Sequence, residues 1–177
     1  MGRRSIKGFK QRLRLFRRKD DGATAIEFAF IALPFFALIS LVFETATMLF
    51  TDISLQNGVN QTARLIRTGQ VQTQGISQGR FREILCGNVA FYLDCSKIRV
   101  FVTKSSTPTF TNRTNLMTAT ATTQQRWEVG AASEWTLVQV SYDWKLFIPK
   151  ISMLGNVDEN TRRIVAGALF RNEPFGG

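Results

Sequence analysis

An apolar run without a single charge constrains the fold of this chain more than any other feature. The run is "FAFIALPFFALISLVF", residues 28–43, and it lies between Glu27 and Glu44. With "ATAIE" in front it begins at Ala23 and forms a helix about 31 Å long, which matches the hydrocarbon core of a bilayer. The two carboxylates then fall near the two interfaces, where a charge costs less than at mid-depth. The run therefore predicts a transmembrane helix, which we place at residues 23–52.

Positive charge is concentrated before this helix. The chain has 23 Lys and Arg residues and a formal net charge of +10, and nine of the Lys and Arg residues lie in residues 1–21. The positive-inside rule then predicts a basic cytoplasmic leader at 1–22, a single pass through the inner membrane, and a periplasmic head at 53–177. Apolar residues recur at helical spacing in the leader: Ile6, Phe9, Leu13 and Phe16. A basic amphipathic helix on the anionic leaflet and a disordered leader both remain open.

The helix is predicted to continue beyond the membrane. Leu55, Val59, Ala63 and Ile66 recur at helical spacing in an otherwise polar segment, which indicates a helix that continues to about residue 67 and packs on a soluble head. Gly69 is the expected end signal. A second, short helix is predicted from Ser77 to Cys86, with Ser77 as its N-cap.

Strand patterns follow in the second half of the chain. Apolar residues recur at every second position in "KIRVFVT" (97–103), "WTLVQVSYDWKLF" (135–147) and "RIVAGALF" (163–170). Three such runs predict an antiparallel sheet, and the long helix laid on one face gives an α+β fold. The Thr-rich stretch 105–125 is poor in core residues and is predicted to be a long loop or a ragged hairpin, either mobile or acting as a contact loop.

The residue types exclude most chemistry. The chain contains no histidine and shows no Gly-rich phosphate loop, carboxylate pair or set of four metal ligands. We therefore expect no enzyme, no cofactor and no metal site. A nucleic-acid partner is not expected either, because the basic block directly precedes a membrane span and no folded nucleic-acid module accompanies it.

The two cysteines, Cys86 and Cys95, lie nine positions apart. The predicted topology puts them in the periplasm, which is oxidising. A helix that ends near Cys86 and a strand that begins near Lys97 return the chain, so that the thiols approach each other. A disulfide is predicted, and two free buried thiols are the alternative.

Gly22 and Ala23 stand where the leader meets the apolar helix, and Glu27 is the fifth residue after the glycine. This order resembles the processing motif of type IV prepilins. The resemblance implies that a membrane prepilin peptidase cuts between Gly22 and Ala23. Glu27 would then pair with a new N-terminal amine, in a neighbouring subunit, because an unpaired charge is costly in apolar surroundings. The alternative is that Glu27 only marks the end of the span.

A longer stretch narrows the resemblance. Residues 22–44, "GATAIEFAFIALPFFALISLVFE", are similar to the TadE-like proteins of the tight-adherence (Flp) type IV pilus system, and so are three later stretches: "ARLIRTGQ" (63–70), "CGNVAFYLDC" (86–95) and "FRNEPF" (170–175). The resemblance implies a minor pilin or pseudopilin that takes part in pilus assembly and so supports surface adhesion and biofilm formation. Its implied partners are the inner membrane, the prepilin peptidase, other pilins or pseudopilins, and the tight-adherence secretion machinery.

A different class of function competes with this one. A single-span inner-membrane protein whose periplasmic head binds a partner or a ligand, without any link to pili, would show the same membrane helix. Processing at Gly22 separates the two.

Overall fold

The structure is a computed structural model that describes residues 21–89, 91–119 and 123–175. The chain divides into two compact units, of which the first ends at Phe43 and the second begins at Glu44. Helix α2 (Asp21–Arg67) passes through this boundary and carries Pro34 inside it. The predicted long helix is confirmed. The amphipathic pattern from Ile6 to Phe16 lies outside the described residues, so both interpretations of the leader stay open.

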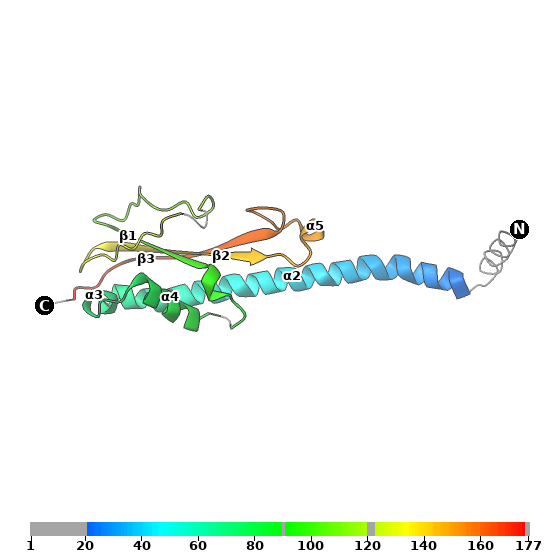
Figure 1. The fold of residues 1–177 in the computed structure, drawn as a ribbon, viewed down its shortest axis with the longest axis horizontal. Coiled ribbons are helices and arrows are strands. Elements are labelled where there is room, and N and C mark those ends of the chain that lie inside the picture. The colour runs from blue at the N-terminus through cyan, green and yellow to red at the C-terminus, as the bar shows by residue number, and fades with distance from the viewer. Residues whose placement is uncertain (1–20, 90, 120–122, 176–177) are drawn as a thin grey trace, which may run out of the picture. The chain divides into compact units, whose positions relative to one another are not determined.

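The second unit is an α+β head, as predicted, and its elements are labelled in Figure 1. After α2 come the helices α3 (Gln70–Thr73) and α4 (Gln78–Gly87), the 3-10 turn η1 (Cys95–Lys97), the strands β1 (Ile98–Ser105), β2 (Trp135–Lys145) and β3 (Thr161–Arg171), and helix α5 (Pro149–Ser152) between β2 and β3. The three strands form one antiparallel sheet in the order β1-β2-β3. The sequence did not predict α3 and α5.

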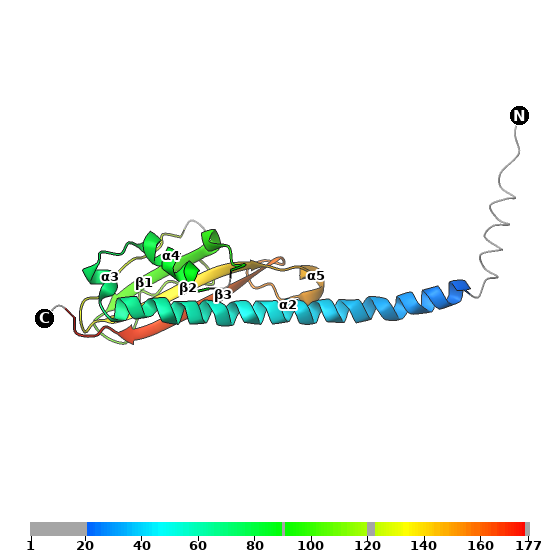
Figure 2. The same ribbon diagram turned by 90° about the horizontal axis from the view of Figure 1, so that it is seen from below.

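One face of the sheet packs on the C-terminal half of α2, which Figure 2 shows from a second side. The predicted helical stripe is buried, with at most 3% of any side chain exposed: Leu55, Val59, Ala63 and Ile66. It meets the inward residues of the strands, among them Val100, Val138, Val140 and Ile164. Burying each large aliphatic side chain stabilises the fold by about 1.5–3 kcal/mol. This contact is the main reason that α2 continues as a helix beyond the apolar run.

The opposite face of the sheet is covered in part by the Thr-rich loop. Beyond Ser105, which ends β1, the described residues of the stretch have no regular secondary structure and form a long loop, as predicted, but Leu116 and Ala119 are buried and form a second apolar cluster with Phe101. The expectation that the stretch is poor in core residues is therefore wrong at these two positions. Strand β1 is therefore covered on both faces, with Val100 in the core cluster on one side and Phe101 in the second cluster on the other, and both side chains are inaccessible.

The turn signals act as the sequence predicted. Gly69 follows the end of α2 with a φ of 78°, a conformation that glycine adopts at little cost. A Cβ there would lie 2.3 Å from the ring of Phe175. Ser77 caps α4, because its hydroxyl accepts a hydrogen bond from the backbone N–H of Arg80 at 3.3 Å.

Side-chain amides form hydrogen bonds with backbone groups along the outer edge of β3. Gln56 of α2 donates to the carbonyl of Gly167 at 3.0 Å and accepts from its N–H at 3.3 Å. Asn156 makes the same pair of bonds with the backbone of Arg163. At the other edge, Val102 of β1 exchanges backbone hydrogen bonds with residues 126 and 128. At these positions the sheet edges are not free to pair with another strand.

Candidate membrane-anchor and assembly site

The first unit carries a helix that is apolar on every side. Ten large apolar side chains are more than half exposed: Ile26, Phe28, Phe30, Ile31, Leu33, Phe35, Phe36, Leu38, Val42 and Phe43. Within the described part of the chain, α2 is the helix long and apolar enough to cross a membrane. Because a helix with this surface needs lipid or other helices around it, α2 fits a single-pass membrane protein.

Gly22 lies in the first turn of α2, which begins at Asp21. A Cβ added at Gly22 would meet no atom within 4 Å, whereas one at Gly58 would lie 2.6 Å from Cγ1 of Val89. Gly58 is therefore needed for packing, and Gly22 is not. Since glycine within a helix costs up to about 1 kcal/mol relative to alanine, the fold itself gives no reason for a glycine at position 22.

Glu27 lies four residues after Ala23 in the same helix, and its side chain is exposed. Residues four apart in a helix lie on the same face, with their Cα atoms about 6 Å apart along the axis. The structure thus brings Gly22, Ala23 and Glu27 together within two turns of one helix. The peptidase cut and the pairing of Glu27 with an amine remain predictions.

Glu44, at the other end of the apolar run, behaves differently. Only 1% of it is exposed. Its Oε1 accepts hydrogen bonds from the backbone N–H of Phe147 and, at 3.3 Å, from that of Ile148. Sequence reasoning treated this residue only as an interfacial charge and missed its role in the head, because its partners are backbone groups 103 residues or more away along the chain. An acid that directly ends an apolar run was the available signal.

The two cysteines are brought together in the head. Cys86 lies in the last turn of α4 and Cys95 begins η1, and the structure joins them with their Cα atoms 5.8 Å apart. This separation is in the range that a disulfide spans. Oxidation in the cell depends on the compartment, so the bridge stays a prediction there.

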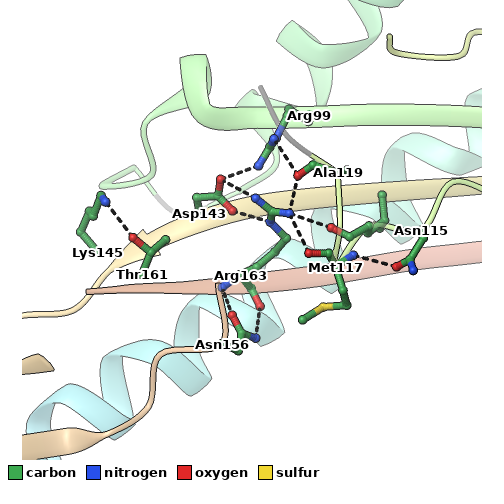
Figure 3. A network of polar contacts seen from close by, with 10 residues as sticks. Arg99, Asn115, Met117, Ala119, Asp143, Lys145, Asn156, Thr161 and Arg163 are labelled. Atoms are coloured by element: carbon green, nitrogen blue, oxygen red, sulfur yellow. Dashed lines mark hydrogen bonds and ion pairs between the residues drawn. The ribbon is translucent and has the colours of Figure 1, made fainter. Parts of the chain in front are cut away.

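A polar network holds the Thr-rich loop to the sheet (Figure 3). The carboxylate of Asp143 on β2 accepts hydrogen bonds from Nε of Arg163 at 2.6 Å and from its Nη2 at 3.0 Å. It also forms an ion pair with Arg99. Nη1 of Arg163 donates to the carbonyls of Leu116, at 2.9 Å, and of Ala119. The sequence interpretation of Asp143 as a polar residue on one strand face did not foresee that the cluster anchors a loop.

The electrostatics of Asp143 fit a structural role. Partial desolvation raises the pKa of this carboxyl, but the hydrogen bond from Arg163 and the charges of Arg99 and Arg163 outweigh it, so the pKa lies below its ordinary value. The carboxylate is therefore ionised and fully engaged near neutral pH. Among the described residues, no three of His, Cys, Asp and Glu gather in a way that could hold a metal ion.

Together, these features define a class of protein. A long N-terminal apolar helix and a three-stranded antiparallel sheet give an α+β protein that fits a single-pass membrane anchor. Residues 22–64 match the family described as TadE-like protein, and the resemblance seen in the sequence is confirmed over this segment. The matched family is structural and pilus-associated, and the match covers less than half of the chain. Comparison with curated proteins and with solved structures gave no match.

Proposed function

We propose that this chain is a minor pilin or pseudopilin that takes part in assembly of a tight-adherence (Flp) type IV pilus, and so supports surface adhesion and biofilm formation. One observation carries the proposal. The TadE-like match begins at Gly22, which has no packing role, and it contains Glu27 and the whole apolar helix. The fold does not need a glycine before the exposed apolar helix, but recognition of this glycine by another protein, such as a peptidase, would explain it.

The proposed topology follows from the charges and the span. Residues 1–22 are a cytoplasmic leader, the apolar run crosses the inner membrane, and the head lies in the periplasm. The proposed partners are the prepilin peptidase, other pilins or pseudopilins, and the tight-adherence secretion machinery. No catalytic group, cofactor or metal is part of the proposal.

Cleavage between Gly22 and Ala23 is sterically straightforward. The first four N–H groups of a helix have no partner within the helix, so the first turn opens at low cost. The bond is then presented in an extended form, and glycine offers no side chain to a peptidase subsite. The peptidase removes the leader and leaves Ala23 as the mature N-terminus, four residues before Glu27.

The mature N-terminus tests this step. Protein from a host that contains a prepilin peptidase should begin Ala-Thr-Ala-Ile-Glu, and Gly22→Leu should retain the leader. Ala25→Leu, an exposed position three residues further on, is the matched control and should be processed normally. An intact leader on the wild-type protein would contradict the proposal and favour a span unrelated to pili.

Assembly through the helix, and not through the sheet, is the second element of the proposal. Gln56, Asn156 and residues 126–128 occupy edge positions of the sheet, which disfavours growth by strand addition. The apolar surface of α2 is exposed on all sides and can pack against helices of other pilins. Glu27 would fix the register of such packing, because its carboxylate is stabilised only where a cationic amine faces it.

A further inference from the structure

Five aromatic side chains form a connected group in the head, which we call the aromatic belt: Phe50, Phe91, Tyr92, Trp144 and Phe147. The ring centroids of Phe50 and Tyr92 are 6.1 Å apart, those of Tyr92 and Trp144 6.2 Å, and those of Trp144 and Phe147 5.6 Å. The belt joins α2, the segment before η1, strand β2 and the segment before α5.

Two hydrogen bonds fix the height of the belt along α2. The carboxylate of Glu44 binds the N–H of Phe147 at one end, and the hydroxyls of Thr51 and Tyr92 lie 3.0 Å apart at the other. The belt therefore spans the stretch of α2 from Glu44 to Thr51, which is about 10 Å long. Glu44 directly follows Phe43, the last apolar residue of the run that is to cross the membrane.

Much of this part of the head is apolar and exposed. Phe91 is 100% exposed, Met153 85% and Phe147 68%. Ile151 of α5 is also more than half exposed, and Lys150 beside it is exposed. Soluble proteins rarely leave such groups together in water, so a partner surface is expected to cover them.

The chemistry of the belt matches the surface of a bilayer. Trp and Tyr gather where hydrocarbon meets water, because each combines an apolar ring with a polar group. In this belt Trp144 is 8% exposed and Tyr92 37% exposed, so the phenylalanine rings supply most of the apolar surface that lipid would meet. The headgroup region on each side of the hydrocarbon core is about 5–8 Å thick. If the hydrocarbon core ends near Glu44, Phe147 and α5 fall within this region, whereas Tyr92, which is bonded to Thr51 about 10 Å further along α2, lies just beyond it. Lys150 can reach lipid phosphates.

We propose that the aromatic belt and α5 dock on the bilayer surface at the point where α2 leaves the hydrocarbon core, so that the head is seated on the membrane and is not only tethered to it. The surface continues directly from the end of the apolar run, and lipid is the partner present at that level. The inference depends on the membrane span and not on pilus assembly.

Spin labels on the full chain in phospholipid vesicles test the inference. Phe147→Cys and Met153→Cys each place a single nitroxide in the docking surface, with the Cys86–Cys95 pair left oxidised. Leu169→Cys is the matched control. This apolar residue of β3 is 51% exposed and pairs with Leu137, near the start of β2. Its neighbourhood contacts Gln56, about 18 Å beyond Glu44 along α2.

Collisions with oxygen, which concentrates in lipid, are compared with collisions with a water-soluble nickel chelate. Labels at residues 147 and 153 should collide severalfold more with oxygen relative to nickel than the label at Leu169. Equal nickel accessibility at all three sites would overturn the proposal. Protection from both reagents that rises with the protein-to-lipid ratio would also overturn it, since a second copy of the chain would then be the occupant.

Discussion

Removal of the Glu44 carboxylate should destabilise the head, although the residue directly follows a membrane helix. Glu44→Ala deletes two charge-assisted hydrogen bonds to the N–H groups of Phe147 and Ile148. Such bonds contribute about 1.5–3 kcal/mol each, and the one to Ile148, at 3.3 Å, is at the weak end of the range. We expect a loss of about 2–4 kcal/mol. For a head of this size that lowers Tm by about 10 °C.

Two measurements on purified full-length protein follow the effect. Near-ultraviolet circular dichroism of the tryptophans gives Tm, and amide hydrogen exchange reports the protection of Phe147 and Ile148 directly. Glu27→Ala is the matched control, because it removes the same side chain from an exposed position of the same helix and should leave both readouts unchanged. A Tm within about 2 °C of wild type, with unchanged exchange at both amides, would refute the role assigned to Glu44.

Two further predictions concern the head. Asp143→Asn should cost about 2–4 kcal/mol at neutral pH, measured by urea unfolding, because Arg99 and Arg163 lose their shared carboxylate. Because the pKa of Asp143 is lowered in the folded state, its contribution to the free energy of unfolding is present above the unfolded pKa of about 3.9 and is lost as the pH falls below it. The difference in stability between wild type and variant should therefore disappear in acid. A difference that persists well below this pH would contradict the assignment. Replacing both Cys86 and Cys95 with Ser should cost about 2–3 kcal/mol, as expected for a short disulfide loop, and two alkylatable thiols in exported wild-type protein would exclude the bridge.

Periodicity in the sequence predicts the framework of this fold. The three alternating runs lie on β1, β2 and β3, and the stripe that includes Leu55 and Ile66 is the buried face of α2. These patterns are local consequences of a period of 2 or 3.6 residues. The cap at Ser77 was also predictable, because its partner is the nearby backbone of Arg80.

Contacts between distant residues could not be predicted in this way. Leu116 and Ala119 enter the core because Arg163, more than forty positions later, holds their carbonyls to the sheet. The burial of Glu44 depends on a turn at Phe147 whose position only the folded head defines. In both cases a polar side chain forms hydrogen bonds with backbone groups. Almost every residue type carries the same backbone groups, so the sequence does not show where such a bond will form.

Pilus output in the presence and absence of this chain tests the central claim most directly. In a strain that lacks the chain, surface pili should be lost or greatly reduced, and the wild-type chain should restore them. Glu27→Ala should be processed and inserted but should fail to restore normal output, since the carboxylate that sets helix register is missing. Undiminished pilus output and surface attachment in the strain without the chain would contradict the assignment to the Tad pilus.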